Sequence, residues 1–246
     1  MSTRRILQIT GTDARDFLQG LITNDIGKIT DGLVYAALLT PQGKYIADFF
    51  LSERGEAVLL DVADALADTL MQRLMMYKLR SDVAITPVPL HLHRGLGPCP
   101  EDGFPDPRHP ELGWRAYRDS PQTDDETDWT ALRVAHLIPE SGVELTPDTF
   151  ILEAGFERLS GVDFKKGCYV GQEVTARMKH KTELRKGLAR VDIMGVAEEG
   201  SAITADGKPV GTLLSHSDTA GIAYLRYDRA KGEMTAGNAR VRRSDG

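Results

Sequence analysis

The chain has 246 residues, of which 41% are hydrophobic and 27% are charged, so it can bury one large core or two to three smaller ones. Its net charge of −6 argues against a protein that wraps nucleic acid through a general basic field. No apolar stretch approaches the ~20 residues of a membrane helix, and the first residues lack the apolar core of a signal peptide. We therefore expect a cytoplasmic protein that binds neither membranes nor nucleic acid.

The chain contains two cysteines, Cys99 and Cys168. A secreted disulfide framework of this size normally carries more, so we expect reduced thiols. Neither cysteine belongs to a Cys-x-x-Cys pair, so the chain alone does not hold an iron–sulfur cluster in the usual four-cysteine manner. Any cluster would be shared with a partner or bound transiently.

Residues 1–86 are predicted to form a first α+β lobe, in which two helices pack on one antiparallel sheet. Strands are expected at 5–9, 33–39, 45–51, 57–62 and 83–85, with a hairpin turn at 40–44. The first helix is indicated by the i, i+3, i+4, i+7 spacing of Ala14, Phe17, Leu18 and Leu21. A longer helix follows, and its apolar stripe is predicted to contain Leu66, Leu70, Met71, Leu74 and Met75.

Residues 87–125 are predicted to be an irregular crossing segment. Eight of the twelve prolines lie between 87 and 121, and proline removes a backbone donor and restricts its neighbour. His91 and His93 would share one face of a strand, but no third ligand lies near them in sequence, so we predict no metal site there.

Residues 126–185 are predicted to form a second α+β lobe, with a helix near Trp129 that ends before Pro139. From residue 186 to 246 the pattern changes to short strands separated by glycines, at 188–193, 202–203, 208–214, 222–226 and 239–241. Short, evenly spaced strands of this kind predict a small C-terminal β-barrel.

Residues 166–177, with the sequence KGCYVGQEVTAR, are the most informative run in the chain. Gly167 and Gly171 allow positive φ or close approach to a ligand, and a helix is expected to start near Gln172. Lys166 and Arg177 would bracket the N–H groups of its first turn, where a bound carboxylate is stabilised. The alternative is a glycine-rich loop that leads into a surface helix.

The segment around this run is basic, although the whole chain is acidic. Between 165 and 186, two acidic residues accompany seven basic ones: Lys165, Lys166, Arg177, Lys179, Lys181, Arg185 and Lys186. A solvated helix end would explain such a cluster. Its position beside the KGCYVGQE motif favours an anionic ligand instead.

The run closely resembles the signature of YgfZ-type folate-binding proteins, relatives of the aminomethyltransferase (T-protein) of the glycine cleavage system. Nine residues fall on motif positions: Lys166, Gly167, Cys168, Tyr169, Gly171, Gln172, Glu173, Ala176 and Arg177. Residues 17–25 (FLQGLITND) and 38–44 (LLTPQGK) are also typical of the wider family. The chain departs from the YgfZ type at 152–156, where the expected polar folate contact is replaced by LEAGF.

The resemblance implies an α+β fold with two related lobes and a C-terminal β-barrel around a central folate pocket. It also implies a tetrahydrofolate-binding accessory protein that supports iron–sulfur cluster assembly or repair, without required turnover. Its partners would be a folate and the assembly proteins or client enzymes, and we expect a monomer. The alternative is a tetrahydrofolate-dependent aminomethyltransferase or related methyl transferase, in which Asp68 would supply the catalytic carboxylate unless it is a solvent-facing helix residue.

Tetrahydrofolate, with or without a polyglutamate tail, needs polar groups inside its pocket and basic groups at the mouth. Candidates for the inner contacts are Asn24, Asp25, Gln172 and Glu173, and Gly171 permits close approach. Tyr169 is a candidate stacking surface, while Lys166 and Arg177 are candidates for the anionic tail. Two alternatives stay open: Asn24 and Asp25 form a turn with its own hydrogen bonds, or Tyr169 packs in the core.

Cys168 is the residue that core packing explains least well. A nearby helix N-terminus, together with Lys165 and Lys166, would favour its thiolate, which raises nucleophilicity or metal affinity. No positioned histidine or aspartate accompanies it in the same segment, so we assign no catalytic residue.

Overall fold

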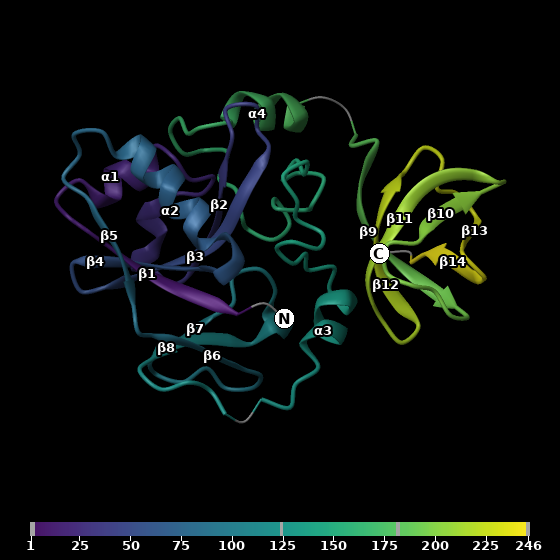
Figure 1. The fold of residues 1–246 in the computed structure, drawn as a ribbon, viewed down its shortest axis with the longest axis horizontal. Coiled ribbons are helices and arrows are strands. Elements are labelled where there is room, and N and C mark those ends of the chain that lie inside the picture. The colour runs from purple at the N-terminus through teal and green to yellow at the C-terminus, as the bar shows by residue number, and fades with distance from the viewer. Residues whose placement is uncertain (1–2, 124, 181–182, 245–246) are drawn as a thin grey trace. The chain divides into compact units, whose positions relative to one another are not determined.

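The computed structural model describes residues 3–123, 125–180 and 183–244, which divide into two compact units (Figure 1). The first unit contains the residues up to Thr127 together with Phe156–Ala176. The second contains Asp128–Gly155 together with the residues from Arg177 onward. Most of the KGCYVGQE motif region therefore folds with the N-terminal part of the chain, not with the barrel that follows it.

The first unit is built on a five-stranded antiparallel sheet with the order β2-β3-β4-β1-β5. Its strands are β1 (Arg4–Thr10), β2 (Val34–Leu39), β3 (Tyr45–Arg54), β4 (Ala57–Ala63) and β5 (Ala84–Val88). Its helical segments are α1 (Ala14–Gln19), the 3₁₀ turn η1 (Ile26–Thr30) and α2 (Asp64–Lys78). These elements confirm the strands and helices expected for residues 1–86.

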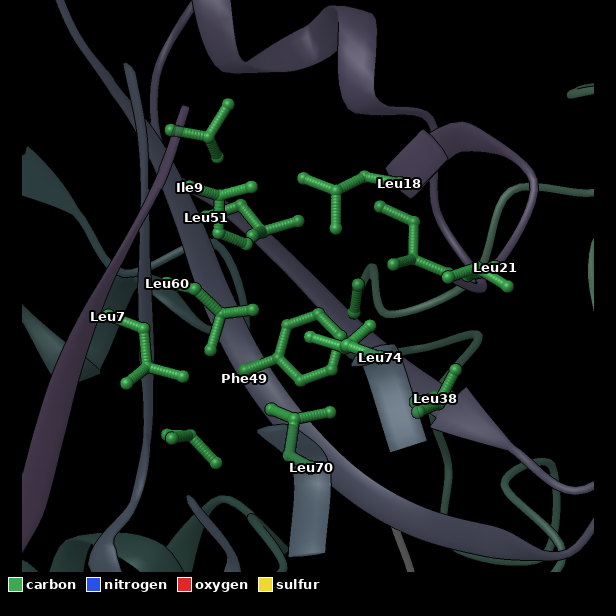
Figure 2. Packing of buried hydrophobic residues seen from close by; sticks show 14 of the residues in the cluster. Leu7, Ile9, Leu18, Leu21, Leu38, Phe49, Leu51, Leu60, Leu70 and Leu74 are labelled. Carbon is green, nitrogen blue, oxygen red and sulfur yellow. The ribbon is translucent and has the colours of Figure 1, made fainter. Parts of the chain in front are cut away.

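One face of this sheet carries the apolar core. Figure 2 shows Leu18 from α1 and Leu70 and Leu74 from α2 directed toward Phe49 on β3. Because side chains alternate along a strand, Phe49 and Leu51 face these helices while Asp48 and Phe50 face the other side. Removal of this apolar surface from water contributes about 25 cal/mol per Å² and orients the helices on the sheet.

A second, three-stranded sheet lies in the segment that was predicted to be irregular. Its order is β6-β8-β7, with β6 (His91–Gly95), β7 (Gly103–Pro105) and β8 (Trp114–Arg118), and the 3₁₀ turn η2 (Pro110–Leu112) precedes β8. The prediction of an irregular crossing is therefore wrong for these residues. Pro87 lies in β5 and Pro105 ends β7, and both are edge strands, where a missing N–H does not interrupt an inner ladder.

The second unit contains a closed barrel with the strand order β10-β11-β12-β9-β14-β13, which confirms the predicted C-terminal barrel. Its strands are β9 (Lys186–Met194), β10 (Ala202–Ala205), β11 (Lys208–Ser217), β12 (Ala220–Arg226), β13 (Glu233–Ala236) and β14 (Ala239–Arg243). The sequence prediction missed β13, although its four residues alternate between exposed and buried.

The helix α3 (Trp129–Ala135) joins this unit through Arg133. Its guanidinium donates to Ile138 O at 2.8 Å and to Ser215 Oγ on β11 at 2.9 Å. The described residues of 126–185 contain α3 and α4 (Gln172–His180) but no strand element, so the second sheet lies earlier in the chain than expected. The predicted α+β class with antiparallel sheets is nevertheless confirmed. No helix in the described ranges has the length and apolar character needed to cross a membrane.

Candidate functional site

The KGCYVGQE motif contacts the β2–β3 hairpin through a glycine. Gly171 has φ +84°, and a Cβ built on it would lie 2.6 Å from Thr40 O, closer than real Cβ atoms come to other atoms. The hairpin turn is closed by Thr40, whose N–H donates to Lys44 O and whose carbonyl accepts from Gly43 N, each at 2.8 Å. The positive φ expected for Gly171 is therefore confirmed, and the group that approaches it closely is the backbone of the hairpin turn.

Gly167 has a different role from Gly171. Its φ lies outside the left-handed region, and nothing lies within 4 Å of a Cβ built on it. The expectation that both glycines serve backbone geometry is thus confirmed for Gly171 alone. No contact within the described chain requires a glycine at 167.

Lys166 is buried, and its ammonium binds the end of α1. Its Nζ donates to Gln19 O at 2.7 Å and to Ile22 O at 2.6 Å, and it lies 5.1 Å from the centre of the Tyr169 ring. The positive charge stabilises the C-terminal end of α1. We had expected it to lie beside the first turn of α4. Burial lowers the pKa of Lys166 to about 8, against the opposing effect of the Asp25 and Asp163 carboxylates.

Asn24 uses its side chain to join two segments. Its Nδ2 donates to Tyr35 O on β2 at 2.8 Å and to Ser160 O at 2.7 Å, so both amide protons are occupied. The Asp25 side chain caps η1 by accepting from Gly27 N at 2.9 Å. Asn24 and Asp25 therefore form a turn with its own hydrogen bonds, which was one of the two interpretations of these residues. Both side chains have a structural role.

The loop before α4 is held at several points and exposes Cys168 between them. Asp163 Oδ1 accepts from Lys165 N at 2.6 Å and from Lys166 N at 3.2 Å, and the other oxygen pairs with Lys28 Nζ at 2.7 Å. Cys168 is a free, exposed thiol, as is Cys99. The sequence prediction missed Asp163, although an aspartate two residues before a Lys-Lys-Gly turn is a common sign of such capping.

The remaining motif side chains differ in exposure. Tyr169 is buried, which raises the pKa of its phenol, while the Thr175 hydroxyl opposes that effect. Gln172 begins α4 half-buried, and Glu173 and Arg177 are exposed in its first and last turns. Lys181 of the predicted basic segment lies outside the described residues. Gln172, Glu173 and Arg177 are thus the predicted contacts whose side chains stay open to a ligand.

Asp68 is a largely exposed residue of α2. Its carboxylate is 79% exposed and accepts from Arg5 Nη1 at 2.5 Å, and Asp64 pairs with the same arginine at 2.7 Å. At 152–156, where the chain departs from the YgfZ pattern, Glu153 accepts a hydrogen bond from Tyr224 OH at 2.6 Å. Both residues belong to the unit that contains the barrel.

A charged layer on the second face of the first sheet was not predicted. Asp61 binds Arg4 Nε at 2.6 Å and Arg115 Nη2 at 2.7 Å, and the Arg115 guanidinium stacks 3.9 Å from the centre of the Phe50 ring. Burial alone would raise the pKa of Asp61, but the two guanidiniums outweigh it and hold the pKa below its ordinary value. A lone carboxylate inside the apolar strand AVLLDVA was the available sign of this layer.

No group of three or more histidine, cysteine, aspartate or glutamate side chains in the described ranges is arranged to hold a metal ion. His93 instead hydrogen-bonds Ser120 O through Nε2 at 2.6 Å.

Comparison with known proteins identifies the family. Residues 185–245 match the family model described as the C-terminal beta-barrel domain of CAF17. The chain is 30% identical to a Mus musculus protein named iron–sulfur cluster assembly factor IBA57, mitochondrial, over 94% of this chain and 78% of that protein. The chain belongs to the IBA57 family. The Homo sapiens member of the family is 28% identical over the same shares of both chains.

The IBA57-family chain also matches a solved structure of the glycine cleavage system aminomethyltransferase T from Bartonella henselae. The TM-score is 0.80 over 99% of this chain and 83% of that one, with 13% sequence identity. This likeness shows the fold alone, and it confirms the predicted relationship to the aminomethyltransferase fold. The predicted cytoplasmic location is wrong, because the family members from mouse, human and Mycosarcoma maydis are all named as mitochondrial proteins.

Proposed function

We propose that this chain is a tetrahydrofolate-binding accessory factor, of the YgfZ type, that supports assembly or repair of iron–sulfur clusters in client proteins. Its IBA57-family relatives are named as iron–sulfur cluster assembly factors, which supports the second half of the proposal. The structural observation that carries it is the exposed Cys168 thiol on a loop fixed by Lys166, Asp163 and Gly171. A fixed loop presents the sulfur to a partner at little cost in conformational entropy.

The thiol would act together with a partner. A cluster is usually held by four thiolates, and this chain has two cysteines that are far apart in sequence. Cys168 would therefore supply one thiolate, and a cluster-assembly protein or client enzyme would supply the other ligands. The chain would hold the cluster only while that complex lasts.

The folate part of the proposal rests on the motif and on the side chains that stay open. Gln172 offers an amide, Glu173 a carboxylate and Arg177 a guanidinium along one helix, which matches the donors and acceptors of a pterin and the charge of a glutamate tail. Asn24 and Lys166 would contribute indirectly, because their hydrogen bonds hold the segment that leads to α4. Asp25 would contribute through its cap of η1. Tetrahydrofolate would supply one-carbon or redox chemistry if any turnover occurs.

Titration calorimetry with tetrahydrofolate and its polyglutamate tests the folate part. We expect the polyglutamate to bind more tightly, and Arg177→Ala to weaken it about two- to fivefold, as for a partly screened ion pair. Added salt should reduce the difference. Arg242→Ala, which removes an exposed arginine from β14, is the matched control and should leave binding unchanged.

Two results would contradict this part. Equal affinities for both ligands in the wild type would remove Arg177 from the folate site. Absence of binding to any reduced folate would reject the folate role and leave the cluster-assembly role to stand on Cys168.

A further inference from the structure

The C-terminal end of α2 exposes three large apolar side chains. Met75 is 50% exposed, Met76 66% and Leu79 88%. The sequence pattern placed Met75 in the buried stripe with Leu70 and Leu74, but the stripe continues through Tyr77, which packs against the core, and leaves Met75 outside it. We call Met75, Met76 and Leu79 the α2 patch. Single exposed apolar residues are ordinary, but three within two turns are not.

Leu79 adopts a backbone conformation that its own side chain disfavours. Its φ of 47° and ψ of −106° lie near those of the first central residue of a type II′ turn, where glycine is preferred. Such strain persists where the surrounding structure or a function maintains it. Since the side chain is almost fully exposed, burial within this chain does not offset the strain.

The α2 patch borders a hollow in the surface. This hollow has a volume of about 710 Å³ and is lined by Asp13, Leu79, Arg80 and Ser81. It is open to solvent and large enough to receive a bulky side chain of another protein. Leu79 thus belongs both to the α2 patch and to the lining of the hollow.

The charges around the patch favour an acidic partner. Arg73 and Arg80 are exposed, and neither forms an ion pair with any residue that the structure describes, whereas Arg4, Arg5 and Arg15 of the same unit all do. Lys78 adds a third positive charge in the last turn of α2.

The two neighbouring carboxylates are already occupied. Asp13 Oδ2 accepts from Asp82 N at 2.7 Å, and Asp82 Oδ2 accepts from Thr12 N at 3.1 Å. Both carboxylates stay charged, and Asp82 interacts electrostatically with Lys78. Neither forms an ion pair with Arg73 or Arg80, so the three positive charges beside the patch exceed the two negative ones.

We propose that the α2 patch is a docking surface for an acidic, amphipathic segment of a partner protein. The segment would insert an apolar side chain beside Leu79 and place carboxylates against Arg73 and Arg80. Contacts that combine a central apolar residue with a charged rim are typical of protein interfaces. This surface uses neither Cys168 nor the folate-binding residues, so it is independent of the function proposed above.

Fluorescence anisotropy with a labelled helical peptide, leucines on one face and glutamates on the other, tests the proposal. Leu79→Gly is the decisive variant, because glycine relieves the backbone strain and removes the side chain. We expect it to weaken binding roughly tenfold while thermal stability stays unchanged or rises. Combined Arg73→Glu and Arg80→Glu should abolish binding of the acidic peptide and favour a lysine-bearing one. Met194→Ser, which removes a 54% exposed methionine from the barrel, is the control and should have no effect.

Four outcomes would overturn the proposal. The first is no binding of the acidic peptide, and the second is equal binding by wild type and Leu79→Gly. The third is a concentration-dependent dimer in analytical ultracentrifugation that Leu79→Gly abolishes, which would make a second copy of the chain the occupant. The fourth is tighter binding to phosphatidylserine vesicles than to the peptide, which would make the patch a lipid contact.

Discussion

Gly43 and Gly171 pack against each other without side chains: a Cβ built on Gly171 would lie 3.2 Å from Gly43 Cα, and one on Gly43 would lie 2.8 Å from Val174 Cβ. This contact joins the hairpin turn of residues 38–44 to the start of α4 (Figure 1). Lys166 adds a second connection, from the same motif to residues 19 and 22. The three sequence blocks typical of the family are therefore neighbours in space.

Substitution of Gly171 tests this packing. Gly171→Ala is expected to lower the free energy of unfolding by roughly 2–4 kcal/mol, because the residue has a positive φ and its Cβ would collide with Thr40 O. Gly167→Ala is the control from the same motif, and it should change the stability by less than about 0.5 kcal/mol. Urea unfolding measures both. Equal losses in the two variants would contradict the contact described for Gly171.

Lys166 should make stability depend on pH in a defined direction. Its pKa is about 8 in the folded chain and 10.5 for an ordinary lysine, so the unfolded chain binds more protons between these values. Stability therefore rises with pH across that window and is independent of this group below it. We expect the free energy of unfolding of the wild type, relative to Lys166→Met, to increase from pH 8 to 10.5. Urea unfolding of both proteins across this range provides the measurement, and a constant or falling difference would refute the assignment.

Asp61 is expected to be far more important for stability than Asp68. Asp61→Asn removes the carboxylate that Arg4 and Arg115 share in a buried layer, and loss of one partner of a buried pair costs about 3–5 kcal/mol. Asp68→Asn removes an exposed partner of Arg5 and should cost less than about 1 kcal/mol. Thermal unfolding compares the two. Folate binding should also survive Asp68→Asn, and its loss would instead favour the transferase alternative.

Cys168 should be dispensable for folding but needed for cluster assembly. Because its thiol is exposed, Cys168→Ser is expected to change stability by less than about 0.5 kcal/mol. Under the proposed function, the variant should lose the ability to support cluster formation on a client in a reconstituted assay. Cys99→Ser is the control, because it removes the other free thiol. Full activity of Cys168→Ser would exclude the thiol as a cluster ligand.

Secondary structure could be predicted from the sequence where the local pattern of apolar residues is sufficient. The β2–β3 hairpin, α1 and most of the barrel could be predicted from the spacing of their apolar residues. An element with one apolar face repeats apolar residues every second position in a strand and every third or fourth in a helix. The sheet formed by β6, β7 and β8 was not predicted, because this segment is rich in proline. Proline is tolerated at strand ends and in edge strands, and periodicity does not reveal which strand is an edge. The exposure of Met75 was missed because residue spacing marks an apolar stripe but not how much of its width the core covers: Tyr77 packs against the core, whereas Met75 does not.

The sequence by itself determined the family motif, the barrel and the scarcity of thiols. Only the tertiary structure decided what the polar side chains do: Lys166 binds the carbonyls of residues 19 and 22, Asn24 joins β2 to Ser160, and Asp61 pairs with two arginines. A side chain's partner is set by which distant segments pack together, and a buried polar group must satisfy its hydrogen bonds with whatever atoms that packing brings near. Sequence spacing does not contain that information, because these partners lie between 54 and 147 positions apart, except for the shorter link from Asn24 to Tyr35.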